Sequence, residues 1–166
     1  MENHTKKVTI LVVDDDELVR TTLGVLVSAL GYPCLAAGDG EEALAMLAAT
    51  TVDLVITDVV MPRMDGLALL HEIKEKHQDT DVIVATGFSE RTTYASVIQA
   101  GAIDFIKKPI DQAELEAKLT RAFRERDLVR RLEQLSMTDS LTSLENRRGF
   151  DLQFAAEVER ASRWGV

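Results

Sequence analysis

The sequence has one cysteine and three prolines in 166 residues, and aromatic side chains make up only 5% of it. The single cysteine, Cys34, excludes an internal disulfide and fits a reducing compartment, where we expect an inert thiol within the core. No apolar run reaches the roughly 20 residues needed to cross a bilayer. The N-terminal residues MENHTKK lack the apolar stretch of a signal peptide. These absences predict a cytoplasmic protein with no membrane partner.

Positive charge is also scarce in the first two thirds of the chain. Residues 1–111 carry 9 Lys and Arg against 18 Asp and Glu, a net charge of 9 − 18 = −9, whereas residues 112–166 carry 10 of each and are neutral. An acidic surface argues against direct binding of nucleic acid, which needs a basic face. It agrees better with a cation site. The uneven charge predicts two parts of different character.

Short aliphatic runs alternate with segments of helical period over the first 111 residues. This alternation is typical of βα units on a parallel sheet, and nearly continuous Val, Ile and Leu indicates strands covered on both faces. The predicted strands span 8–13, 33–37, 53–57, 81–85 and 102–106. The predicted helices between them span 17–30, 41–49, 66–77 and 90–100.

A fifth helix is expected to begin near Asp111 and to continue without Gly or Pro to about residue 135. It would be about 36 Å long, more than is needed to cover one strand. Leu128, Leu132 and Leu135 in its second half have no sheet left to cover, which favours pairing with a second copy. A solvated linker helix is the alternative, and a further helix is predicted over 146–164.

Four consecutive carboxylates, residues 14–17, follow the first predicted strand directly. Like charges a few Å apart repel by roughly 4 kcal/mol at an effective dielectric constant of about 20. Asp14 and Asp15 lie where the strand ends. Asp16 and Glu17 are expected in the first turn of the following helix, near its positive end.

Polar groups follow the other central strands as well, with Asp58 after the third, Thr86 after the fourth and Lys108 after the fifth. Because the carboxyl ends of parallel strands share one edge of the sheet, we expect these groups to meet Asp14 and Asp15 there. Three carboxylates without a nearby His or Cys form a hard oxygen site that suits Mg²⁺. The ion would also offset the repulsion among them.

These residue types point to phosphoryl transfer. Asp58 can attack phosphorus as a nucleophile and form an acyl phosphate. A metal ion and the Lys108 ammonium would neutralise the phosphoryl oxygens, and Thr86 can donate its hydroxyl to them. Pro109 makes the preceding peptide bond a candidate for the cis form, which would aim the ammonium into the site.

The stretches VVDDD, VITDVVMPRMDG, ATG and FIKKPI occur in this order and with suitable spacing. They resemble the receiver domain of two-component response regulators over roughly residues 7–125. The resemblance implies an α/β fold with a flavodoxin-like, doubly wound parallel sheet of five strands in the order 2-1-3-4-5, extended by a C-terminal helix. It also implies that Asp58 accepts a phosphoryl group from a histidine kinase, so that the chain itself is not an enzyme.

The same resemblance assigns the metal ligands. Asp15, Asp58 and the backbone carbonyl of Val60 would hold Mg²⁺, and Asp14 would act mostly through water.

The resemblance also assigns a switch. Thr86 and Lys108 would contact the phosphoryl group. Phe105 occupies the position of an aromatic switch residue, whose ring turns inward as Thr86 follows the phosphate. A plain core phenylalanine on the fifth strand is the alternative.

The C-terminal segment MTDSLTSLENRRGF resembles the entry to a GGDEF diguanylate cyclase domain. The matching positions are Asp139, Leu141, Thr142, Leu144, Asn146, Arg147, Arg148 and Phe150. Ser143 and Glu145 stand where that family often has Gly and Pro. No GG[DE]EF sequence follows, so no catalytic cyclase residue is expected, and the chain is interpreted as the front part of a receiver–cyclase protein. Trimming and natural truncation both fit.

The expected organisation follows from both resemblances. A flexible N-terminus would span residues 1–7, a receiver domain 8–122, a helical linker 123–136 and an incomplete GGDEF-like start 137–166. A cognate histidine kinase and a second copy of the chain are the expected partners. The copies would pair through the face of the fourth helix and fifth strand, or through the long fifth helix.

Two alternatives stay open from the residues. A haloacid-dehalogenase-type hydrolase would use Asp14 and Asp16 as a D-x-D pair, although no insertion long enough for a substrate cap is present. A receiver with a DNA-binding output is the other alternative, although the neutral tail lacks a basic cluster.

Overall fold

The computed structural model describes residues 8–87 and 94–137, and within them five strands form one parallel sheet. The strand order β2-β1-β3-β4-β5 confirms the expected flavodoxin-like topology. The strands are β1 (Ile10–Val13), β2 (Cys34–Ala37), β3 (Leu54–Asp58), β4 (Asp81–Thr86) and β5 (Asp104–Lys107). Each lies within one or two residues of its predicted span.

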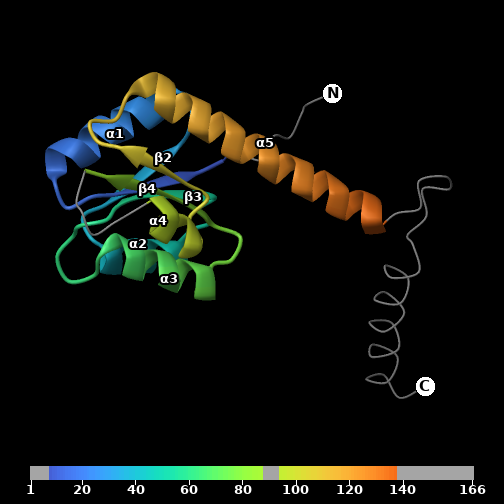
Figure 1. Ribbon diagram of the computed structural model, residues 1–166, viewed down its shortest axis with the longest axis horizontal. Coiled ribbons are helices and arrows are strands. Elements are labelled where there is room, and N and C mark those ends of the chain that lie inside the picture. The colour runs from blue at the N-terminus through green and yellow to red at the C-terminus, as the bar shows by residue number, and fades with distance from the viewer. Residues whose placement is uncertain (1–7, 88–93, 138–166) are drawn as a thin grey trace, which may run out of the picture. The chain divides into compact units, whose positions relative to one another are not determined.

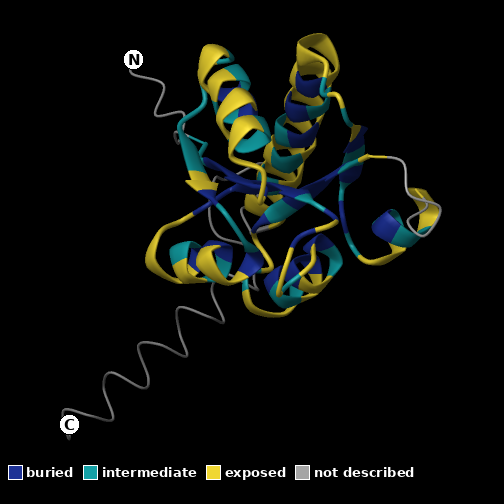
Figure 2. Ribbon diagram, turned by 90° about the vertical axis from the view of Figure 1, so that its left-hand side faces the viewer, coloured by how far each residue is buried: buried dark blue, intermediate teal, exposed yellow. Residues whose placement is uncertain are grey.

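Helices cover both faces of the sheet. α1 (Glu17–Ala29) and the first turns of α5 (Gln112–Met137) lie on one face, and α2 (Gly40–Ala49), α3 (Gly66–Lys76) and α4 (Tyr94–Gln99) lie on the other (Figure 1). The central strands are accordingly buried along their length (Figure 2). This two-sided cover explains why these strands read as continuous aliphatic runs rather than alternating ones.

Aspartates begin three of the helices. Asp16, Asp39 and Asp65 are the N-caps of α1, α2 and α3, and each side chain accepts backbone N–H hydrogen bonds from the first turn. Asp16 was expected inside the first turn of α1; it lies one position earlier, where its carboxylate can reach two amides. Because these helices all start at the carboxyl edge of the sheet, the caps also fix the loops that carry the polar residues of that edge.

The apolar stripe of α5 changes character along the helix. Leu115 and Leu119 are fully buried, whereas Leu128, Leu132 and Leu135 are 53%, 65% and 65% exposed. The helix nevertheless continues unbroken to Met137, as its composition predicted. The chain divides into two compact units, Met1–Lys118 and Leu119–Val166, and α5 contributes to both.

Several expectations fall outside the described residues: the N-terminal segment 1–7, the helix over 146–164 and the GGDEF-like pattern. Among the described helices, none combines the length and apolar character needed to span a membrane.

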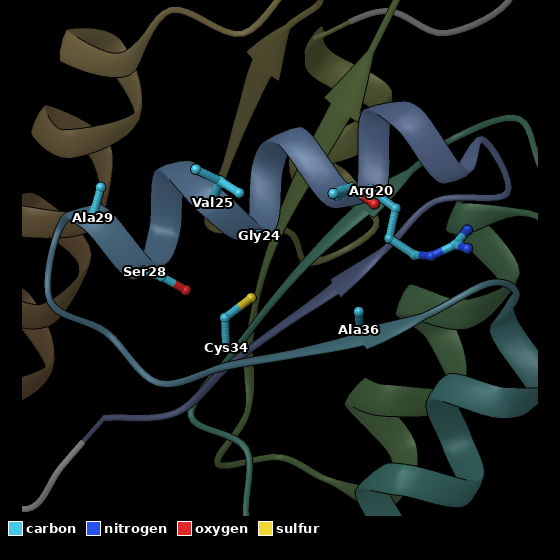
Figure 3. A pocket seen from close by; sticks show the side chains of 8 residues that line it. Arg20, Gly24, Val25, Ser28, Ala29, Cys34 and Ala36 are labelled. Carbon is cyan, nitrogen blue, oxygen red and sulfur yellow. The ribbon is translucent and has the colours of Figure 1, made fainter.

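Cys34 lies on an edge strand and is half-buried, so the prediction of a core thiol is wrong in its location. It lines a shallow pocket of about 630 Å³ between β2 and α1, together with Arg20 and Val25 (Figure 3). Burial raises the pKa of the thiol, and its sulfur lies 3.4 Å from the carbonyl oxygen of Leu35. The thiol therefore stays protonated at neutral pH, and the pocket contains none of the carboxylates of the polar edge.

Candidate functional site

Three carboxylates meet at the carboxyl edge of the sheet. Asp14 and Asp15 follow β1, and Asp58 is the last residue of β3, which pairs with β1 so that Val13 is opposite Thr57. Oxygens of the three side chains all lie within 4.8 Å of one another. Parallel pairing thus brings together residues that are more than forty positions apart in the sequence.

Lys108 joins this cluster from the loop after β5. Its Nζ lies 2.6 Å from Oδ2 of Asp14 and 3.3 Å from Oδ1 of Asp58. The Lys108–Pro109 peptide bond is cis, and the backbone N–H of Lys108 donates to the carbonyl of Thr86 at 2.9 Å. One ammonium therefore offsets part of the repulsion between two carboxylates.

Burial differs sharply among the four side chains. Asp14 is only 2% exposed, Asp58 14% and Lys108 21%, whereas Asp15 is exposed. Asp15 is therefore the carboxylate of the cluster that solvent and a dissolved cation reach most easily.

The cluster is short of positive charge. Burial raises the pKa of Asp58, the attraction of Lys108 opposes this, and the Asp14 charge adds to the increase. Burial acts to lower the pKa of Lys108, but the hydrogen bond to Asp14 and the charges of both aspartates outweigh it and raise this pKa. Lys108 thus remains an ammonium while Asp58 is destabilised as an anion, so additional positive charge beside Asp58 would be favourable.

The loop after β1 is held by hydrogen bonds that the sequence did not suggest. The guanidinium of Arg20 donates to the backbone carbonyl of Asp14 at 2.6 Å, and Asp14 Oδ1 accepts the backbone N–H of Asp16 at 3.0 Å. On the β3 side, Asp58 Oδ1 accepts the N–H of Val59 at 2.8 Å. Arg20 reaches this carbonyl because α1 folds back over the loop. No sequence pattern predicts this contact.

Thr86 is the last residue of β4 and Phe105 is the second residue of the neighbouring strand β5, and both lie outside the carboxylate cluster. The hydroxyl of Thr86 donates to the carbonyl of Gly87 at 2.7 Å, so its one proton is not directed at a carboxylate. Phe105 is half-buried against the core, and its ring lies 5.0 Å from that of Tyr94 in α4. Val60, two residues after Asp58, carries a side chain that is 69% exposed.

A family profile described as the response regulator receiver domain matches residues 10–120. The chain is 41% identical over 111 residues to the DNA-binding transcriptional regulator NtrC of Salmonella typhimurium, covering 67% of this chain and 24% of that protein. It is 34% identical over 118 residues to a cyclic di-GMP phosphodiesterase of Thermotoga maritima, covering 71% of this chain and 32% of that protein.

Among solved structures, NtrX from Brucella abortus superimposes with a TM-score of 0.73 and 35% identity, over 83% of this chain and 32% of that one. The chain thus spans 24% to 57% of the length of the first curated relatives that it matches. The matched residues include all four members of the carboxylate–lysine cluster.

Proposed function

The chain belongs to the family of response regulator receiver domains, and we propose that Asp58 is the residue through which it accepts a phosphoryl group. The observation that carries this proposal is the position of Asp58 beside the Lys108 ammonium and within the cluster of Asp14 and Asp15. Within the described residues both contacts of the Asp58 carboxylate use Oδ1. Oδ2 is therefore the oxygen we assign as the nucleophile.

The donor set fits Mg²⁺. Three carboxylates lie within 4.8 Å of one another with no His or Cys among them, and hard oxygen ligands are those that Mg²⁺ prefers. Asp15, Asp58 and the backbone carbonyl of Val60 would hold the ion, with Asp14 acting through water. When bound, Mg²⁺ would neutralise charge on the phosphoryl oxygens.

The residues of the chain then have distinct parts in the transfer. Oδ2 of Asp58 forms a bond to phosphorus while the bond between phosphorus and the imidazole nitrogen of a histidine kinase breaks, and the leaving imidazole takes up a proton. Lys108 presents its ammonium to the phosphoryl oxygens. The product carries about −1.5 to −2 charge where Asp58 had carried one, by analogy with other phosphorylated side chains.

A switch would follow from this new charge. We assign Thr86 to contact the phosphoryl group by turning its hydroxyl away from the carbonyl of Gly87. The ring of Phe105 would move inward into the space that Thr86 leaves. The half-buried position of Phe105 beside α4 is what supports this assignment.

The test is direct phosphorylation with a small acyl phosphate and Mg²⁺. We expect one phosphate per chain that withstands acid and is released by hydroxylamine, as intact-mass measurement would detect. Asp58→Asn should gain none, while Asp79→Asn, which changes an exposed carboxylate away from the cluster, should behave like the unaltered chain. An equal gain in Asp58→Asn would refute the assignment.

A histidine kinase and a second copy of the chain are the proposed partners. The copies would pair through the surface of α4 and β5 or through α5, whose second half exposes Leu128, Leu132 and Leu135. Leu132→Glu distinguishes these two routes in sedimentation experiments on the phosphorylated chain. Loss of association would assign the contact to α5, and unchanged association would assign it to α4 and β5.

The output is proposed from the C-terminal segment, with residues 8–122 as the receiver, 123–136 as the linker and 137–166 as the start of a cyclase domain. The GGDEF-like pattern supports a diguanylate cyclase. NtrC, a relative that is named as DNA-binding, supports a second candidate, a transcriptional output. DNA binding by this chain that weakens steeply with salt would favour the second and count against the first. The family membership leaves no support for a dehalogenase-type hydrolase, and Asp16 is engaged as a helix cap.

A further inference from the structure

Lys118, in the second turn of α5, is held by two carboxylates that do not belong to the proposed phosphoryl site. Its Nζ lies 3.0 Å from Oδ1 of Asp104 and 3.7 Å from a carboxylate oxygen of Glu114. The Asp104 residue is 6% exposed and the Lys118 side chain 19%, so this ion pair is largely withdrawn from water. A largely buried ion pair keeps a defined geometry, because separating the two charges would leave each of them buried without a counter-charge and would destabilise the fold.

The same ammonium faces the ring of Phe105. Lys118 Nζ lies over that ring, 5.2 Å from its centroid, which is within the range of a cation–π attraction. Asp104 Oδ1 also accepts the backbone N–H of Phe105 at 2.7 Å. One oxygen of Asp104, Oδ1, therefore accepts hydrogen bonds both from the Lys118 ammonium and from the backbone N–H of the ring's own residue.

We propose that Lys118 is a positioning residue for Phe105: anchored by Asp104, its ammonium holds the aromatic ring in the observed place and restrains the inward turn. The inference rests on the proposed switch role of Phe105. If the ring turns inward, the Lys118–Asp104 pair can persist, but the contact between ammonium and ring is lost. Lys118 thus sets how much of the protein occupies the switched state before and after phosphorylation.

The size of the effect follows from that one lost contact. Cation–π contacts at partly exposed sites correspond to roughly a two- to fivefold change in an equilibrium constant. A ligand that binds only the switched state binds more tightly when that state becomes more populated, by the same factor. Removing the ammonium should therefore tighten the binding of a phosphoryl mimic about two- to fivefold, without any change at Asp58.

Lys118 could instead serve only to neutralise Asp104, and the variants are chosen to separate these roles. Lys118→Met alone leaves a buried carboxylate without its cation and is expected to destabilise the fold. We therefore compare Asp104→Asn with Asp104→Asn combined with Lys118→Met. Asparagine keeps the oxygen that accepts both the Phe105 N–H and the Lys118 ammonium, so the anchor of the ammonium is retained. The two proteins then differ only in the ammonium. Lys118→Arg should keep a cation over the ring. Lys76→Met removes an exposed lysine at the end of α3 and serves as a charge control.

The first readout needs no phosphoryl chemistry. The chain has five phenylalanines, so labelling with 4-fluorophenylalanine gives a small set of ¹⁹F resonances, and Phe105→Leu identifies the signal of residue 105. We expect the signal to shift between the single Asp104→Asn protein and the double variant, and to stay near its normal position in Lys118→Arg and Lys76→Met. An unchanged signal in the double variant would overturn the inference.

The second readout is titration of each protein with beryllofluoride and Mg²⁺. The double variant should bind about two- to fivefold more tightly than Asp104→Asn. Equal affinities would mean that Lys118 acts on Asp104 alone and would overturn the inference. Failure of the unaltered chain to bind beryllofluoride would instead count against the proposed function, while the ¹⁹F signal would still decide whether Lys118 positions Phe105.

Discussion

Replacing Gly66 by alanine is expected to destabilise the protein strongly and to disable the phosphoryl site at the same time. A Cβ atom at this position would lie 1.9 Å from the backbone oxygen of Asp58, 2.8 Å from its carbonyl carbon and 3.0 Å from Cα of Val59. All three are backbone atoms, so no side-chain rotation relieves the overlap. The chain must shift where β3 ends, and that is where Asp58 is held.

The local hydrogen bonds make such a shift costly. The N–H of Gly66 donates to the carbonyl of Val59 at 2.8 Å, and Asp65 caps α3 through the N–H of Ala68 at 2.8 Å. Moving Gly66 away from β3 strains both the turn and the cap. Overpacking of this kind costs about 3 kcal/mol at the upper end of the usual range. We expect a loss of that size in urea denaturation, and much slower phosphorylation of whatever remains folded.

Gly24→Ala provides the matched control for Gly66→Ala. Gly24 lies inside α1. A Cβ atom added there would lie 3.8 Å from the Cys34 sulfur, which is an ordinary contact distance. Here alanine should stabilise by roughly 0.5–1 kcal/mol, because glycine is entropically unfavourable in a helix. If Gly66→Ala were as stable as the unaltered chain, the close approach of α3 to the end of β3 would be wrong.

The sequence predicted most of the sheet because buried parallel strands leave a direct trace in it. Runs such as residues 54–56 are apolar on both faces, as is expected of strands that helices cover on both sides. The polar residues after these runs could be collected into one site without coordinates, since all the carboxyl ends share an edge. This reasoning needs only strand direction, and it correctly brought Asp14, Asp15, Asp58 and Lys108 together.

The contacts that the sequence missed depend on how helices fold back over that edge. Arg20 reaches the carbonyl of Asp14 from α1, and Lys118 reaches Asp104 from α5. The two residues of each pair do not lie on one helix or strand, so no helical or strand repeat in the sequence predicts that they meet. Cys34 was misplaced for a different reason: its strand looks apolar in the sequence, and the core position was inferred from that apolar run although the expected strand order puts the strand at the sheet edge.

Asp15 and Asp16, which are adjacent in the acidic run after β1, are expected to have different roles: Asp15 in binding Mg²⁺ and Asp16 in capping α1. Asp15→Ala removes a proposed Mg²⁺ ligand. It should therefore reduce Mg²⁺-dependent phosphorylation by more than the roughly 10- to 100-fold that follows loss of a group hydrogen-bonded to a metal ligand. Its thermal stability without metal should be unchanged or slightly higher, since Asp15 is exposed and repels its neighbours in the cluster. Phosphorylation rates with acyl phosphate and melting curves measure both effects.

Asp16→Ala should show the opposite pattern. The Asp16 carboxylate accepts the N–H groups of Leu18 and Val19 at 2.8 Å and 3.2 Å as the cap of α1, and its loss should cost about 1 kcal/mol of folding free energy. The hydrogen bond from the backbone N–H of residue 16 to Asp14 Oδ1 is retained, because alanine has the same backbone N–H. Phosphorylation should therefore remain almost intact while the melting temperature falls.

Added Mg²⁺ separates the two substitutions most sharply. A ligand that binds the folded state stabilises it by RT ln(1 + L/Kd), where L is the free ligand concentration. The melting temperatures of the unaltered chain and of Asp16→Ala should therefore both rise with Mg²⁺. That of Asp15→Ala should not. If both variants lost phosphorylation equally, or both still responded to Mg²⁺, the boundary between metal site and helix cap would not lie between residues 15 and 16. The capping bonds of Asp16 and the exposure of Asp15 support a boundary between these two residues.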